Sequence, residues 1–141
     1  MKRKNTDQLL KELMDSNDLS RVLSDNSACF REGDLPHGLQ ALFDQQDMSK
    51  SALAKASGIS EVYLHQVFSG RRTPSRDRLL CLCIGLGAST EETQSLLQQA
   101  HHAPLYARDK RDAVLLFGLS LSLTLPEIND ALFTAGAETL L

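Results

Sequence analysis

Residues 49–75 read SKSALAKASGISEVYLHQVFSGRRTPS, and this run contains the start and stop signals of two short helices. Ser49 and Ser60 are expected N-caps, because each precedes a run with apolar residues at helical spacing. Gly58 stands between the two helices, where a tight turn needs a left-handed backbone, and Gly70 ends the second helix. The side chains that would face a core are Leu53, Ala54, Leu64 and Val67. The run therefore predicts two helices joined by a tight turn, the helix-turn-helix arrangement.

The flanking residues continue this helical pattern on both sides. Pro36 suits the first turn of a helix that ends near Asp47, and Pro74 with Ser75 begins another helix after the quoted run. The apolar residues that would line these two helices are Leu39, Leu42 and Phe43, then Leu79, Leu80, Leu82, Cys83 and Leu86. We therefore expect an all-α domain over residues 35–88.

Residues 1–34 are predicted to form an N-terminal helical arm and a linker. Leu9, Leu10, Leu13 and Met14 share one face at helical spacing, and Leu19, Val22 and Leu23 suggest a second short helix. Thr6 is the expected N-cap of the first helix. Residues 24–34 are polar and aperiodic, which predicts the linker. The apolar face of the arm has to pack either on the rest of the chain or on a second subunit.

An internal repeat with a spacing of 35 residues runs through the C-terminal part of the chain. Arg76-Asp77 recurs as Arg111-Asp112, Ser89 with Glu92 as Thr124 with Glu127, and Leu97 with Ala100 as Leu132 with Ala135. Each copy has the pattern of a helix, a short loop, a capping box and a second helix. The repeat predicts two helical hairpins packed side by side, with residues 89–141 forming a C-terminal helical extension.

Residues 119–125 alternate between apolar and polar side chains, as a strand would. A lone strand would leave its backbone edges unpaired, and the repeat equates this segment with a helix end and loop. We prefer the helix and loop.

Length and composition favour a small globular protein. A chain of 141 residues, 42% hydrophobic and 23% charged, can bury one core, either alone or with a smaller helical appendage. No stretch resembles a signal peptide or approaches a membrane span, so we expect a cytoplasmic protein without membrane contact. Cys29, Cys81 and Cys83 lack metal-ligand spacing; buried free thiols are the simpler interpretation and a redox sensor is the alternative.

The charge is unevenly distributed along the chain, whose net charge is −3. Residues 36–80 carry six basic and four acidic side chains, whereas residues 81–141 carry three and seven. Phosphate binding requires a local basic surface and not a basic protein. The segment with the two short helices is therefore the candidate for binding nucleic acid.

Residues 39–86 resemble the Xre/Cro/lambda-repressor family of helix-turn-helix proteins. The matching residues are Ser49, Leu53, Ala54, Gly58, Ile59, Ser60, the turn Ser69-Gly70-Arg71-Arg72, Pro74-Ser75 and the run from Leu86 to Ser89. The resemblance implies a lambda-repressor-like all-α fold and a transcription regulator that binds specific double-stranded DNA, acting as a repressor. It also implies a homodimer on an inverted repeat, with half-sites about one helical turn apart.

The resemblance places the second helix of the pair, residues 60–69, in the major groove. The positions that correspond to base-contacting ones are Glu61, Val62 and Gln66, with Tyr63 and His65 beside them. Gln66 suits adenine, Glu61 can accept from cytosine, and Val62 can pack on a thymine methyl. The expected phosphate contacts are Lys50, Ser60, Ser69, Arg71 and Arg72, with Arg76 and Lys55 as weaker candidates. For Tyr63, His65, Arg71 and Arg72 the alternative is an ordinary exposed or half-buried position.

One feature departs from the family pattern. Many members have an Arg on the first helix that pairs with a Glu at the end of the recognition helix, and Phe43 and Phe68 stand there instead. We expect an apolar contact between these two rings in place of the ion pair.

The sequence has no pattern that favours an enzyme. We find no nucleophile-base arrangement, phosphate-binding glycine loop or metal-ligand set, and expect no catalytic residue, cofactor or metal. His101 and His102 are adjacent, and we assign them to a helix end. The alternative to a DNA-binding regulator is a protein-interaction module or antitoxin-like partner with the same fold. It would bind its protein partner through the N-terminal or C-terminal helices.

Overall fold

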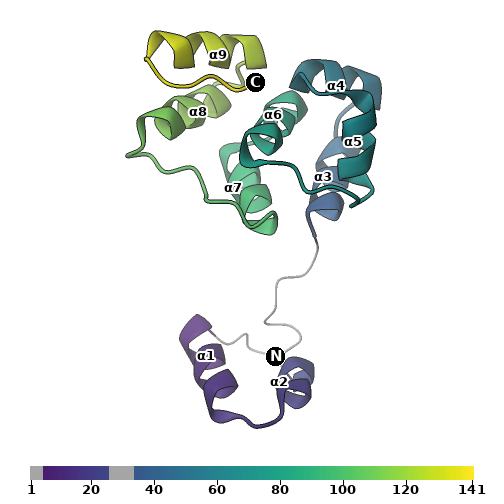
Figure 1. Ribbon diagram of the computed structural model, residues 1–141, viewed down its shortest axis with the longest axis vertical. Coiled ribbons are helices and arrows are strands. Elements are labelled where there is room, and N and C mark those ends of the chain that lie inside the picture. The colour runs from purple at the N-terminus through teal and green to yellow at the C-terminus, as the bar shows by residue number, and fades with distance from the viewer. Residues whose placement is uncertain (1–4, 26–33) are drawn as a thin grey trace. The chain divides into compact units, whose positions relative to one another are not determined.

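The computed structural model describes residues 5–25 and 34–141, and all regular structure in these residues is helical (Figure 1). The helices are α1 (Thr6–Asp15), α2 (Leu19–Asp25), α3 (Leu35–Asp44), α4 (Lys50–Ser57), α5 (Glu61–Phe68), α6 (Arg76–Leu86), α7 (Thr90–Gln99), α8 (Lys110–Ser120) and α9 (Leu125–Thr134). The chain forms two compact units, Met1–Glu32 and Gly33–Leu141. The prediction of an all-α fold is confirmed.

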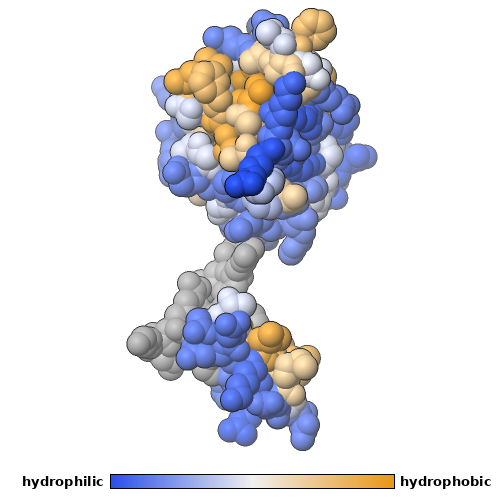
Figure 2. Space-filling view, turned by 90° about the vertical axis from the view of Figure 1, so that its left-hand side faces the viewer, coloured by the Kyte–Doolittle hydropathy of each residue, from blue (hydrophilic) through white to orange (hydrophobic). Residues whose placement is uncertain are grey.

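The N-terminal unit is a pair of amphipathic helices. The N-cap of α1 is Asn5, whose side chain accepts a hydrogen bond from the backbone N–H of Gln8 (2.8 Å), while Gln8 Oε1 accepts one from Asn5 N–H (3.0 Å). The prediction of Thr6 as the cap was therefore wrong by one residue, because this reciprocal box satisfies two helix-end donors. Val22 is the buried residue of the pair. Apolar side chains reach the surface of both units (Figure 2).

The prediction of a linker over residues 24–34 was wrong for its first two residues. Ser24 and Asp25 are the last residues of α2, and Asp34 is the N-cap of α3, where its carboxylate accepts from His37 N–H (3.1 Å). The rest of that segment lies outside the described residues.

The larger unit begins with the helices that the quoted run predicts. Ser49, Ser60 and Ser75 are N-caps of α4, α5 and α6, and each hydroxyl accepts a hydrogen bond from the backbone N–H three residues later. Gly58 has φ 67°, so it provides the left-handed turn between α4 and α5. The α3 helix ends at Asp44, three residues before the predicted end. These helices therefore follow from capping and apolar spacing.

The closest helix packing in this unit is that of α4 on α6. Gly85 allows it, because a Cβ at this position would lie 2.3 Å from Ser57 Oγ and 3.2 Å from Leu53 Cδ1. Leu53, Leu82 and Leu86 are each at most 2% exposed in the resulting core. A continuous core joins α3–α6 to α7–α9. The helix that follows the turn motif is therefore the centre of the unit.

The internal repeat corresponds to two helical hairpins, α6–α7 and α8–α9. Ser89 with Glu92 and Thr124 with Glu127 form capping boxes at the starts of α7 and α9, as predicted. The correspondence extends beyond the predicted residues: Gln94 exchanges two hydrogen bonds with the backbone of Leu105, and Asn129 does the same with Leu140. Residues 119–125 form the end of α8, a loop and the start of α9. The preferred helix-loop interpretation of this segment is confirmed.

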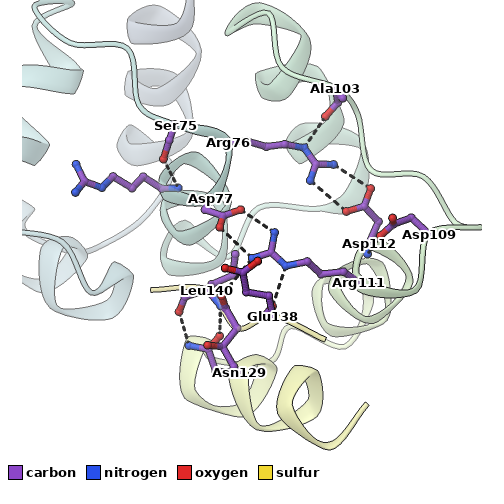
Figure 3. A network of polar contacts seen from close by, with 12 residues as sticks. Ser75, Arg76, Asp77, Ala103, Asp109, Arg111, Asp112, Asn129, Glu138 and Leu140 are labelled. Carbon is purple, nitrogen blue, oxygen red and sulfur yellow. Dashed lines mark hydrogen bonds and ion pairs between the residues drawn. The ribbon is translucent and has the colours of Figure 1, made fainter. Parts of the chain in front are cut away.

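Crossed ion pairs join the two hairpins (Figure 3). Arg76 on α6 binds both carboxylate oxygens of Asp112 on α8 (3.2 and 3.0 Å), and Arg111 on α8 binds both of Asp77 on α6 (2.9 and 3.0 Å). The hydrogen bonds with Asp77 raise the pKa of Arg111. Each arginine also donates to backbone carbonyls at the end of its own copy: Ala103 and Pro104 for Arg76, Glu138 and Thr139 for Arg111. Each hairpin thus supplies one Arg and one Asp at equivalent positions, as the two subunits do in a two-fold symmetric interface.

Candidate nucleic-acid interface

The α5 helix has one face in the core and one face in solvent. Leu64 and Val67 are fully buried, which fixes the rotation of the helix about its own axis. Glu61, Val62 and His65 are exposed on the outward side, and Val62 is 70% exposed. Because the buried residues hold the helix firmly, the outward side chains form a rigidly placed surface.

The segment after α5 folds back over the end of this helix. Gly70 has φ 83°, and the backbone N–H groups of Arg71 and Arg72 both donate to Gln66 O (2.9 and 3.2 Å). Ser69 Oγ donates to the same carbonyl (3.1 Å). Both arginine side chains are exposed. The turn therefore holds two cations close to the C-terminal end of α5.

One edge of the outward face carries a lysine held over two aromatic rings. Phe43 on α3 and Phe68 on α5 pack edge to face with ring centroids 5.7 Å apart, which confirms the predicted apolar contact. Lys50 Nζ lies 3.9 Å from the Phe68 centroid and 4.9 Å from that of Phe43. The aromatic faces attract the ammonium group and restrict its position. A cation thus lies at the contact between α3 and α5.

The opposite edge carries two arginines beside a tyrosine. The guanidinium of Arg78 on α6 lies 4.5 Å from the Tyr63 ring centroid, and that of Arg72 lies 5.7 Å from it. Arg78 was not among the predicted site residues. It lies on the neighbouring helix, and no local sequence signal connects it with Tyr63.

The remaining predicted residues fall into three groups. Gln66 is half-buried beside the exposed face, while His65 Nε2 lies 3.7 Å from Glu61 Oε1, one helical turn away. Ser60 Oγ accepts from Tyr63 N–H (3.1 Å) and Lys55 is exposed near the end of α4. Arg76, predicted as a weaker phosphate contact, donates four hydrogen bonds within the fold through Nε, Nη1 and Nη2.

The other polar groups singled out in the sequence have structural partners or are buried. His102 Nε2 lies 2.8 Å from Pro74 O, and no cluster of metal-ligating side chains occurs in residues 5–25 and 34–141. Burial raises the pKa of Cys81 to about 11 and that of Cys83 to about 12, so both remain thiols at neutral pH. Cys29 lies outside the described residues.

Residues 34–96 match a protein-family model described as a helix-turn-helix domain. The match covers α3 to α6 and most of α7, so the chain contains a helix-turn-helix domain. No curated protein and no solved structure matches the chain. Among the described residues, every helix is too short or too polar to cross a membrane.

Proposed function

We propose that this protein is a sequence-specific transcription regulator, with no catalytic role, that inserts α5 into the major groove of double-stranded DNA. The observation that carries this proposal is the placement of cations along both edges of the exposed α5 face. Lys50 lies at the edge marked by Phe68, and Arg72 and Arg78 lie at the edge marked by Tyr63. A major groove is bordered by a phosphate backbone on each side, so this arrangement matches the charge pattern of DNA.

The side chains between these edges would read the bases. Gln66 can form two hydrogen bonds with adenine, Glu61 can accept from a cytosine amino group, and Val62 can pack against a thymine methyl. His65 stays a further candidate because it is exposed beside Glu61. Tyr63 is given a different role, since its ring lies beside two guanidinium groups: it positions them.

Phosphate binding would come from Lys50, Arg71, Arg72 and the additional residue Arg78. Ser60 would add a hydroxyl contact at the start of α5, and Ser69 would add one at its end after turning its hydroxyl away from Gln66 O. Such contacts set the register of the helix in the groove without specifying sequence. Arg76 is left out, because its bonds to Asp112 and the backbone use four of its five N–H groups.

The proposed regulator is a cytoplasmic homodimer that binds an inverted repeat and represses transcription by blocking the promoter. A single inserted helix of eight residues reads only a few base pairs. Two copies on half-sites about one helical turn apart would supply the remaining specificity.

Selection of binding sites from a random DNA library tests this proposal. The recovered site is then titrated by fluorescence anisotropy over a salt series, with the wild-type protein, Arg71→Ala/Arg72→Ala, Gln66→Ala and a matched control, Arg108→Ala. Arg108 is an exposed cation in the loop between α7 and α8. We expect a palindromic site, and a salt slope about four units smaller in the double variant than in the wild type, because each of the two subunits loses two phosphate contacts.

The Gln66 variant should lose discrimination at one base-pair position of each half-site, while Arg108→Ala should resemble the wild type. Failure to enrich any site, with no binding near physiological salt, would contradict the proposal. That outcome would favour the protein-interaction module with this fold.

A further inference from the structure

The outward face of α8 is largely apolar, although a helix face turned to water is normally polar. The residues that line this face at helical spacing, which we call the α8 face, are Lys110, Ala113, Val114, Phe117, Ser120 and Leu121. Phe117 is 59% exposed and Leu121 is 57% exposed. The opposite side of the helix contributes Leu115 and Leu119 to the core. The α8 helix therefore has two apolar faces. One is buried in the core, as in an ordinary amphipathic helix, and the other is the exposed α8 face.

The internal repeat shows what covers the corresponding face in its other copy. The counterparts of Phe117, Ser120 and Leu121, 35 residues earlier, are Leu82, Gly85 and Leu86. Leu82 and Leu86 are at most 2% exposed, and α4 packs against Gly85. A helix thus covers this face on α6. Within residues 34–141, no helix covers the same face of α8.

We propose that the α8 face binds the α8 face of a second copy of this chain, with the two helices antiparallel about a two-fold axis. Ser120 is small and lies where Gly85 allows close approach on α6, so it leaves room for a neighbouring helix. Phe117 and Leu121 on either side of it would form the apolar centre of the contact. Each copy supplies the same patch, as a two-fold contact requires.

The charges at the two ends of the α8 face fit this antiparallel arrangement. Lys110 is exposed at the beginning of the face, and Glu127 is exposed in the first turn of α9, just beyond its other end. Hydrogen bonds from the Thr124 backbone and side chain lower the pKa of the Glu127 carboxyl, so it is ionised at neutral pH. Antiparallel pairing brings each Lys110 to the partner's Glu127. Parallel pairing would instead place like charges together at both ends.

The contact is small, because one helix face of this length lies at the low end of interface sizes. We therefore expect a dissociation constant in the micromolar range, on the order of 1–10 µM. The role of this dimer, which is to present two α5 helices to one DNA site, rests on the proposed function. The interface itself does not. The dimer is measured without DNA, so the two proposals are tested separately.

Sedimentation equilibrium of the full chain over a concentration series tests the interface. The wild-type protein should change from monomer to dimer, and Phe117→Glu/Leu121→Glu should stay monomeric at concentrations about 100-fold higher. Phe133→Glu is the matched control, because Phe133 is 79% exposed on α9 outside the α8 face. It should dimerise like the wild type. Circular dichroism melting checks that each variant is folded.

A charge exchange tests the orientation. Lys110→Glu should weaken the dimer several-fold, and adding Glu127→Lys should restore it. A wild-type chain that stays monomeric at about 100-fold above the expected dissociation constant would overturn the inference. A dimer that survives Phe117→Glu/Leu121→Glu but is lost in Leu10→Glu/Met14→Glu would also overturn it, and would assign the interface to the arm. A monomer that still selects a DNA site would overturn this inference and leave the proposed function standing.

Discussion

Arg111 on α8 and Asp77 on α6 are 34 residues apart in sequence and are joined by two parallel hydrogen bonds of 2.9 and 3.0 Å. Their counterparts one repeat away, Arg76 and Asp112, form the reverse pair. Asp112 is the more buried of the two carboxylates, and it also accepts from Tyr106 N–H (3.0 Å). The two pairs therefore occupy different environments, and we expect them to differ in their effects on stability.

Removal of the buried Asp112 carboxylate should destabilise the larger unit more than removal of the half-buried Asp77 carboxylate. Asp112→Ala leaves Arg76 and the Tyr106 N–H without their acceptor, and should lower the free energy of unfolding by about 2–4 kcal/mol. Asp77→Ala should cost about 1 kcal/mol, because water can solvate the partner. Urea unfolding measures both, with the exposed Asp130→Ala as the control. Equal losses for Asp77→Ala and Asp112→Ala would contradict this ranking.

The Ser57 hydroxyl should be dispensable for stability. Ser57 Oγ is buried without a hydrogen-bond partner in the described structure, so Ser57→Ala removes an unsatisfied polar atom and should leave stability unchanged or raise it by about 1 kcal/mol. Gly85→Ala places a methyl group 2.3 Å from that oxygen and should destabilise by about 1–3 kcal/mol. The double variant should lose less than Gly85→Ala alone. Thermal unfolding would reveal this coupling between the two positions. If the stability changes of Ser57→Ala and Gly85→Ala simply add in the double variant, the contact between residues 57 and 85 is not supported.

The buried thiols should make stability fall at alkaline pH. Desolvation raises the pKa of Cys81 to about 11 and that of Cys83 to about 12, above the ordinary value near 9 that applies to the unfolded chain. The folded protein therefore holds protons that the unfolded chain releases. This contribution is fully present below about pH 9 and is lost as pH rises through the folded-state values. Urea unfolding measures the free energy of unfolding at each pH. This free energy should fall less at alkaline pH in Cys81→Ala/Cys83→Ala than in the parent protein. The same dependence on pH in both proteins would count against burial of the thiols.

Tyr63 should act on DNA binding through its aromatic ring and not through its hydroxyl. Tyr63→Ala removes the ring beside Arg72 and Arg78 and should weaken DNA binding about 3–10-fold, with a smaller salt slope. Tyr63→Phe keeps the ring face and should bind like the wild type. Anisotropy titrations over a salt series distinguish the two variants. An equal loss in Tyr63→Phe would instead assign a direct hydrogen bond to the hydroxyl.

The local elements were predictable because their signals are local. Ser49, Gly58 and Ser60 define the turn motif through capping and backbone preference, and the 35-residue repeat predicts the second hairpin. Thr6 was mistaken for a cap because Asn5 has an equally suitable side chain one residue earlier. Adjacent candidates of this kind differ by too little energy for sequence patterns to separate them.

The partners across the fold were not predictable from the same signals. The repeat marked Arg76 and Asp112 as recurring positions, but recurrence does not show which residues meet. The resemblance made Arg76 a weaker candidate for a phosphate contact, whereas its carboxylate partner lies 36 residues away. Lys50 was predicted as a cation of the site, while its support on Phe43 and Phe68 depends on how α3 and α5 pack.

The crossed pairs also bear on how such a chain can change over time. Two identical hairpins from separate polypeptides would form the same Arg–Asp contacts twice, so one substitution would alter both sites at once. With both copies in one polypeptide, each site can vary without the other. One copy can then keep the surface that packs on α4 while the other acquires a new partner, and the different surroundings of Asp77 and Asp112 show that the two halves already differ.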